Sequence, residues 1–403
     1  MDVIDVPDIA SPAFFADRYP TYRALRDNFP FFRTEIDGEP CIVLTRYADV
    51  DEGLRNPLIT VQPEPGRFPE RVGHGPASRH YRESLPSMDP PDHTRIRRLV
   101  TRAFTPQAVA KMRGWIEEVI EQHLAMLKHE SEIDFITAFA SPVSTEIASR
   151  LLHVPVADGE DLFRTSHALL AVLGVSSMAD GALDAADAAA RVYQAYMQDV
   201  LETMKGKQLP EDDFLAVLLA AEDAEKGMTR SESVTTMAGF IIASYHTTKI
   251  MMTNAVLALL RHPSQKARLI EQPSFASSAW EEALRYDGAV HFMHRYASRQ
   301  ITIGGASIDP GCRLLLGLQA ANRDERRFPD PDRFIIDRPR NRHFGFAGGP
   351  HFCMGAPLAR LEGEILLQRL FQYFPRMRLN GDPPAPAGDI SFPVLMRLDL
   401  ALR

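Results

Sequence analysis

The loop around Cys353 combines residue types that could hold a metal-bearing ligand. Residues 344–360 read FGFAGGPHFCMGAPLAR, so Gly348, Gly349 and Pro350 precede Cys353, Gly355 follows it, and a helix is expected to begin directly afterwards. A thiolate at a helix N-terminus is stabilised by the helix dipole and by unpaired backbone N–H groups. Glycines beside it let the backbone approach a flat ligand closely. Taken alone, the pattern also suits a structural cysteine in a glycine-rich turn.

A second group of reactive side chains interrupts the longest apolar segment. Residues 237–260 read MAGFIIASYHTTKIMMTNAVLALL, with five polar residues, 244–248, at the centre. Burying such groups without partners costs about 1–3 kcal/mol each. Lys249 and this cluster argue against a membrane span, because a charge near the centre of a bilayer is costly. We therefore expect a buried core helix whose polar residues have a function.

Composition excludes several classes of protein. The 403 residues include 45 basic and 53 acidic ones, a formal charge of −8, which argues against a nucleic-acid partner. The first residues, MDVIDVPDIASP, lack a basic region followed by an apolar one, so no secretory signal is expected. The three cysteines lie far apart in the sequence and form no disulfide framework. A cytoplasmic protein that does not bind membranes is the expectation.

The elements that must position these residues are mainly helices. Residues 18–28 and most of 92–272 show helical patterns, broken by prolines, whereas FFRTEI and CIVLTR flank Asp37-Gly38 as a strand pair. After Arg285 the runs RQITIGG and RLLLGLQ predict short strands. A last helix follows Cys353, where Met354, Leu358, Leu361 and Ile365 form one apolar stripe. The fold class is mostly α with small β-sheets.

The cysteine loop resembles the haem-binding loop of the cytochrome P-450 family, in its soluble bacterial type. The match to Phe-x-x-Gly-x-x-x-Cys-x-Gly runs through Phe346, Gly349, Cys353 and Gly355. The resemblance implies that haem b lies between a long central helix and this loop, and that the Cys353 thiolate is the axial ligand of its iron. It also implies one domain over residues 1–403.

Further matches follow in order along the chain. By resemblance, His93, Arg97, Arg295 and His351 would contact the haem propionates, since two buried carboxylates need several cationic or N–H donors. Each could otherwise be an ordinary surface charge. Glu282 and Arg285 would join Arg333, in the segment Pro331-Asp-Arg333-Phe334, as a buried charge network with a structural role.

The polar helix would cross the haem opposite the cysteine. The family pattern Ala-Gly-x-(Asp/Glu)-Thr-Thr is matched by Ala243 to Thr248, with Thr247 at the oxygen-activating position and its hydroxyl able to bond the Ala243 carbonyl. Two residues depart from the pattern: Ser244 replaces glycine and His246 replaces the acid. Three alternatives follow for proton delivery: His246 takes over the relay, a substrate group does so, or His246 points away and packs.

Substrate contacts can be predicted only by region. The candidates are residues 60–87, residues 165–195, and the side chains of Val290, His291, Phe292, Met293 and Phe392. His291 and His294 could equally be bystanders in the core. The substrate is expected to be a small molecule, a natural-product intermediate that is hydroxylated, epoxidised or oxidatively coupled.

Electrons would come from separate proteins, because no flavin motif appears. Basic residues near the cysteine side would dock an acidic ferredoxin-type donor, itself served by a reductase; these are Arg95, Arg98, Arg102, Lys111, Arg113, Arg340 and Arg342. A solvated basic face is the alternative. The resemblance therefore implies a monooxygenase that places one atom of dioxygen in the substrate. A non-oxygenating haem-thiolate protein (an isomerase-type enzyme, a sensor or a carrier) is the second functional class, kept open by His246.

Overall fold

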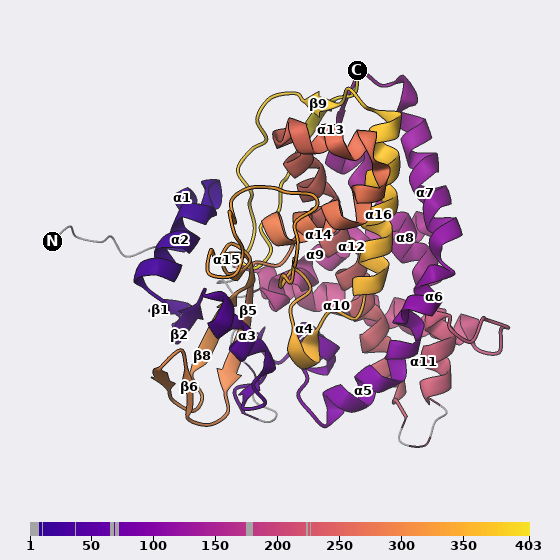
Figure 1. Cartoon of the computed structure of the whole chain (residues 1–403). Coiled ribbons are helices and arrows are strands. Elements are labelled where there is room, and N and C mark those ends of the chain that lie inside the picture. The colour runs from indigo at the N-terminus through magenta and orange to yellow at the C-terminus, as the bar shows by residue number, and fades with distance from the viewer. Residues whose placement is uncertain are drawn as a thin grey trace.

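The computed structural model describes residues 8–9, 11–36, 38–64, 68, 72–174, 180–222, 225 and 227–403. Helices dominate the right of Figure 1 and the small sheets lie at its lower left and top. The predicted class, mostly α with small β-sheets, is confirmed. Within the described residues, no helix is long and apolar enough to span a membrane.

The α-helices contain about half of the residues that the structure describes. They are α1 (Pro12–Ala16), α2 (Arg18–Asn28), α3 (Tyr47–Arg55), α4 (Pro76–Glu83), α5 (Asp92–Val100), α6 (Pro106–Ala110), α7 (Arg113–Met126), α8 (Ser141–Leu151), α9 (Val156–Leu173), α10 (Ala182–Met204), α11 (Phe214–Glu222), α12 (Arg230–Arg261), α13 (Pro263–Glu271), α14 (Ala276–Asp287), α15 (Leu318–Ala321) and α16 (Ala356–Tyr373). Short 3₁₀ turns include η7 (Gly349–His351), just before the cysteine.

Within the described residues, the strands form three small sheets. They are β1 (Phe31–Ile36), β2 (Glu39–Leu44), β3 (Ile59–Thr60), β4 (Glu132–Asp134), β5 (Phe292–Ala297), β6 (Ile301–Ile303), β7 (Ala306–Ile308), β8 (Arg313–Gly317), β9 (Arg378–Leu379) and β10 (Asp399–Ala401). The largest sheet has the order β1-β2-β8-β5-β3, with β2 and β8 parallel and Cys41 opposite Arg313. The predicted strand pair is β1 and β2; Asp37 itself lies outside the described residues.

The apolar segment 237–260, with its central polar residues 244–248, lies within the long helix α12. A capping box starts this helix: the Thr229 hydroxyl accepts the Glu232 N–H, and the Glu232 carboxylate accepts the Thr229 N–H. The helix packs against α8, α9, α10 and α14, so most of its surface is buried. The expectation of a core helix over residues 237–260 is confirmed.

Helix α16 follows the cysteine loop and packs into the core. Leu358, Leu361 and Ile365 are all buried, which confirms this part of the predicted apolar stripe, whereas Met354 precedes the helix and is half-buried. The helix packs between α7 and α14. The large apolar cluster to which α16 belongs extends from Val72 to Leu402. That the whole chain is one domain stays a prediction.

Candidate haem-thiolate site

Backbone hydrogen bonds fix the position of Cys353 at the start of α16. The Cys353 N–H donates to the Phe346 carbonyl at 3.0 Å, and the Phe352 N–H donates to the Gly349 carbonyl at 3.1 Å. Gly349 has a φ of +64°, and a Cβ there would lie 2.0 Å from the Leu54 carbonyl oxygen, so only glycine fits. Cys353 itself is exposed. The loop therefore presents a thiol in a fixed place.

Opposing effects act on this thiol. The surrounding protein limits hydration of the sulfur and raises the pKa of the Cys353 thiol. The backbone N–H groups of Gly355 and Ala356 and the charges of Arg97 and Arg360 act in the opposite direction, toward a lower pKa. The helix N-terminus and the two arginines thus offset part of the effect of burial, which on its own disfavours the thiolate form that a metal binds.

The four residues predicted to hold the propionates cluster beside Cys353. The rings of His93, on α5, and His351, in η7, lie 4.1 Å apart between centroids. Arg97 donates to the Phe352 carbonyl at 2.5 Å. Arg295, on β5, is buried and donates to the His294 carbonyl at 2.7 Å. The fold therefore brings together residues that lie as far apart in the sequence as 93 and 351.

The chemistry of this cluster fits an anionic ligand. Burial together with the charges of Arg295 and Arg97 lowers the pKa of His351 to about 2 and that of His93 to about 4. His93 Nε2 is buried and has no hydrogen-bond partner in the described part of the chain. Asp89 acts on Arg295, but its carboxylate already accepts the N–H groups of Val61 and Gln62. A dicarboxylate such as haem b would satisfy these donors.

The threonine of the central helix makes the predicted bond. The Thr247 hydroxyl donates to the Ala243 carbonyl at 2.7 Å, and Ser244 does the same to Phe240 at 2.7 Å. The helix is continuous from Arg230 to Arg261, so these bonds do not interrupt it. Ala243 is exposed although the preceding Ile242 is buried, which leaves an accessible strip on α12 at Ala243 and Thr247.

His246 points from α12 toward α9. Its Nε2 lies 2.7 Å from the Ser166 hydroxyl oxygen, and Ser166 donates its own proton to the Phe163 carbonyl at 2.6 Å. His246 must therefore donate from Nε2 to Ser166. Burial and the charges of Lys249 and His167 lower the pKa of His246 to about 3. Of the three alternatives, this geometry supports the one in which the histidine points away and packs.

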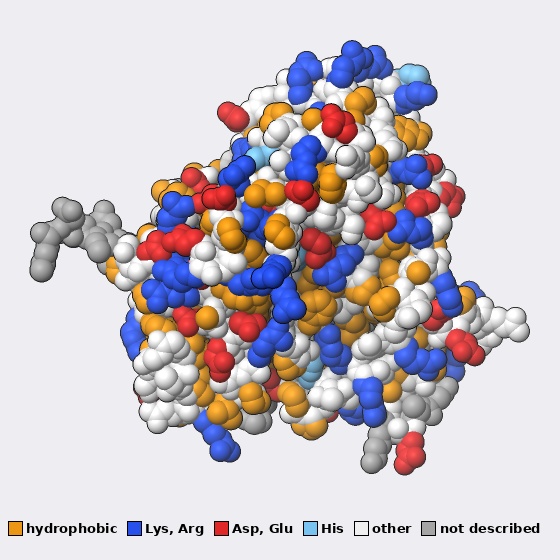
Figure 2. Space-filling view, viewed as in Figure 1, with side chains coloured by type: hydrophobic (Ala, Val, Ile, Leu, Met, Phe, Trp, Pro, Cys, Tyr) orange, Lys and Arg blue, Asp and Glu red, His pale blue; other side chains and the backbone are white. Residues whose placement is uncertain are grey.

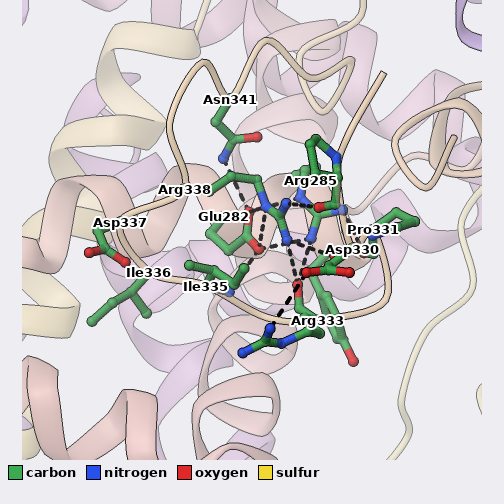
Figure 3. Close-up of polar contacts among 12 residues, drawn as sticks. Glu282, Arg285, Asp330, Pro331, Arg333, Ile335, Ile336, Asp337, Arg338 and Asn341 are labelled. Carbon is green, nitrogen blue, oxygen red and sulfur yellow. Dashed lines mark hydrogen bonds and ion pairs between the residues drawn. The ribbon is translucent and has the colours of Figure 1, made fainter. Parts of the chain in front are cut away.

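The buried charge network contains a different arginine from the one predicted. Glu282 and Arg285 are fully buried and form two hydrogen bonds of 2.8 Å, but the further guanidinium bonded to Glu282 belongs to Arg338, at 3.1 Å (Figure 3). The Arg333 side chain is 73% exposed and pairs with Asp330. Its carbonyl accepts from Arg285 and Arg338. The assignment of the Arg333 side chain was therefore wrong, since its backbone alone takes part.

Two of the predicted substrate contacts lie elsewhere. His291 is fully buried and bonds the Tyr22 hydroxyl at 2.9 Å, while Phe292 packs against the same tyrosine. A side chain without accessible surface cannot line a ligand pocket, so these two assignments were wrong. Val290, Met293 and Phe392 are half-buried and stay predictions. His294 bonds the Tyr81 hydroxyl at 3.0 Å.

A buried acid on α16 was not predicted from the sequence. Glu362 is 2% exposed, its Oε2 has no hydrogen-bond partner among the described residues, and its carboxyl bonds the Thr248 side chain. Burial raises the pKa of Glu362 to about 8. The residue lies four positions after Leu358, on the apolar side of the helix, and an acid at such a position was a signal that it faces the core.

The predicted basic surface is only partly free. Figure 2 shows Lys and Arg side chains near the middle of one face, over the loop between α15 and α16. Arg98, Arg102, Arg340 and Arg342 are exposed. The other three predicted residues pair with acids: Arg95 with Glu232, Lys111 with Asp212, and Arg113 with Glu364.

Comparisons with known proteins agree with this site. The chain is 35% identical over 374 residues to the vitamin D(3) 25-hydroxylase of Pseudonocardia autotrophica, covering 92% of this chain and 90% of that protein. It is 31% identical to the 6-deoxyerythronolide B hydroxylase of Saccharopolyspora erythraea, covering 94% and 93%. The crystal structure of P450BioI with an acyl carrier protein matches with a TM-score of 0.90 at 29% identity, covering 97% and 100%.

The family assignment rests on nearly the whole chain. The family model described as Cytochrome P450 matches residues 17–272 and 274–390. This range includes the cysteine loop, the donor cluster and the central helix. The chain therefore belongs to the cytochrome P450 family and is a P450 monooxygenase.

Proposed function

We propose that Cys353 binds the iron of haem b through its thiolate and that the enzyme hydroxylates a natural-product intermediate. The observation that carries the proposal is the exposed thiol of Cys353 at the N-terminus of α16, next to a cluster of N–H donors. His93, Arg97, Arg295 and His351 would hold the propionates. Phe346, Gly349 and Gly355 would shape the loop under the ring, and Ala243 would face the opposite side.

Haem bound through a thiolate supplies activation of dioxygen, which consumes two electrons and two protons and leaves one oxygen atom as water. The protein must bring those protons to the accessible strip of α12. The Thr247 hydroxyl donates its hydrogen bond to the Ala243 carbonyl, so its oxygen can accept a hydrogen bond from a proton donor.

Glu362 is the candidate source of protons. Its pKa of about 8 keeps the carboxyl protonated near neutrality, and its bond to Thr248 places it beside α12. His246 does not take this role in our proposal, because its Nε2 proton is committed to Ser166. A route from Glu362 past Thr248 to Thr247 would replace the acid that the family carries at position 246.

The proposed substrate class follows from the relatives. One is named for the hydroxylation of vitamin D(3) and another for that of 6-deoxyerythronolide B. Hydroxylation is therefore the first reaction to test here, ahead of epoxidation or coupling. Val290, Met293 and Phe392 are the candidate contacts to mutate once a product is known.

Electrons would come from an acidic ferredoxin-type protein and its reductase. The exposed arginines Arg98 and Arg102 would contact that donor, and reversing both charges should slow reduction of the enzyme without changing substrate affinity. Added salt should slow the wild type as well. Equal reduction rates in the variant and the wild type would contradict this docking surface.

The carbon monoxide complex of the reduced protein tests the ligand directly. Thiolate ligation should give the red-shifted Soret band, and Cys353→Ser should lose it. Cys41→Ser and Cys312→Ser are matched controls that should keep it, since Cys41 is buried in β2 and Cys312 precedes β8. A band typical of histidine ligation in the wild type would overturn the proposal.

The loss of the family's acid at position 246 is the feature that keeps the second functional class open, although membership of the cytochrome P450 family favours the monooxygenase. A non-oxygenating enzyme, sensor or carrier needs no proton route to dioxygen. Turnover under isotopically labelled dioxygen, with a ferredoxin and reductase present, separates the two classes. Label in the product supports the monooxygenase, whereas conversion without label supports an isomerase-type enzyme.

A further inference from the structure

A charge cluster braces the cysteine loop from the side of α14. Arg360, on α16, donates from Nε to one oxygen of Glu281 at 2.7 Å and from its terminal nitrogen to the other at 3.1 Å. Its guanidinium also lies over the Phe346 ring, 4.7 Å from the ring centroid. Phe346 in turn accepts the Cys353 N–H at 3.0 Å. Arg360 thus contacts the residue that holds Cys353.

His343 completes the brace. Its Nδ1 accepts the Gly345 N–H at 2.9 Å, so the neutral ring carries its proton on Nε2 and donates it to Glu281, 3.2 Å away. Both oxygens of Glu281 are therefore bonded. The side-chain bonds of this one carboxylate join α14, α16 and the start of the cysteine loop.

The arginine brings a positive charge close to the proposed iron ligand. Arg360 is one of two arginines whose charge reaches the Cys353 sulfur. A cation near a thiolate draws electron density from it and favours an added electron on the iron. Glu281 places an opposite charge in contact with Arg360, so the pair presents little net charge to the loop.

We propose that Glu281 and Arg360 set the reduction potential of the haem in opposite directions, with Glu281 offsetting the charge of Arg360. The inference rests on the proposed function, because it needs haem bound through Cys353. Both are positioning residues, as neither contacts reacting atoms. The step concerned is the transfer of one electron from a reductant to ferric haem, which gives ferrous haem.

The test is a potentiometric titration of the substrate-free holoenzyme, reduced stepwise with dithionite at fixed ionic strength and followed by absorbance. Glu281→Gln keeps an acceptor for His343 and Arg360 but removes the negative charge. Its equilibrium constant for reduction should rise about threefold, which is about 30 mV for one electron. Arg360→Met should lower it by a similar factor, the double variant should return close to wild type, and Arg360→Lys should stay near wild type.

The chain offers a matched control on the same helix. Arg113 and Glu364 form an ion pair with side chains 42% and 26% exposed, against 41% and 25% for Arg360 and Glu281. Glu364→Gln should leave the potential unchanged, because this pair has no contact with the cysteine loop among those described. High salt should shrink the shifts of both Glu281→Gln and Arg360→Met, since the pair is partly exposed.

The direction of the shifts in reduction potential distinguishes an effect of charge from an effect of altered loop structure. Mere loosening of the loop would move both single variants the same way, and that result, or shifts no larger than that of Glu364→Gln, would overturn the inference. If Glu281→Gln does not fold with haem, Arg360→Met compared with Arg360→Lys still decides it. The carbon monoxide spectrum of each sample separates the two proposals, because a wild type without the thiolate band contradicts the proposed function itself.

Discussion

His246 on α12 and Ser166 on α9 are joined by a buried hydrogen bond of 2.7 Å, between a ring nitrogen and a hydroxyl oxygen. The bond runs between helices that lie 80 residues apart in sequence at this point. A histidine inside an apolar helix thus has a partner that satisfies it. This relationship changes the expectation for His246 from proton relay to a link between two helices.

Replacing His246 should affect stability more than coupling. His246→Ala should lower the free energy of unfolding by about 1–3 kcal/mol, since it leaves a cavity and removes the Ser166 partner. The ratio of product to peroxide should stay near that of wild type. His246→Gln, which keeps a donor, should recover part of the stability. Diversion of electrons to peroxide in His246→Ala, with stability unchanged, would restore the relay hypothesis.

Buried histidines should make the fold sensitive to acid. The pKa of His246 is lowered to about 3 and that of His291 to about 4, against about 6.5 in an unfolded chain. The unfolded state therefore binds more protons below that value. The contribution of these two neutral histidines to the free energy of unfolding is fully present above about pH 6.5. It is lost as the pH falls, by up to about 1.4 kcal/mol per pH unit for each histidine.

Denaturant unfolding of wild type between pH 7.5 and 5 measures this loss. His246→Gln should show a shallower dependence on pH over that interval, and His129→Gln, at an exposed position, should follow wild type. An unchanged slope in His246→Gln would mean that this histidine is not held neutral by the fold.

Motifs carried the prediction of the cysteine loop and of the fold class, because glycine and cysteine spacing is local. Thr247 and its bond to Ala243 were also predictable, since residues four apart on a helix adjoin. The partner of His246 was not, because it lies on α9 and only packing brings the two helices together. Sequence likewise could not show that His291 bonds Tyr22, on α2.

Arg333 illustrates a different limit. The segment that covers the Glu282–Arg285 pair was predicted, and its backbone does accept from Arg285 at 3.1 Å. Which arginine of the segment turns inward depends on the course of an irregular loop, which no periodicity describes. The side chain of Arg338, five residues later, reaches Glu282 instead.

The two arginines should therefore differ strongly in mutation. Arg338→Met should lower the free energy of unfolding by about 3 kcal/mol, because it removes one partner of the fully buried Glu282 and leaves the remaining charges unbalanced. Arg333→Ala should change it by less than about 0.5 kcal/mol, since its side chain is on the surface. Thermal unfolding of both holoproteins checks this, and equal losses would contradict the assignment.

Glu362 should influence turnover and stability in opposite ways. Its pKa is raised to about 8 in the fold, against about 4.3 for an unfolded glutamate, so the folded state binds more protons between these values. The contribution of the neutral Glu362 carboxyl to the free energy of unfolding is therefore present at low pH and is lost as the pH rises through about 8. Glu362→Gln should remove this loss and make the protein more stable than wild type at pH 8.

The same substitution should slow proton delivery. Glutamine can bond Thr248 but cannot release a proton at that site, so electrons should form more peroxide and the solvent isotope effect on turnover should change. Glu364→Gln, on the same helix but paired with Arg113, is the control. If Glu362→Gln is stabilised at pH 8 and yet turns over with wild-type coupling, Glu362 is a neutral core residue and protons reach Thr247 by another route.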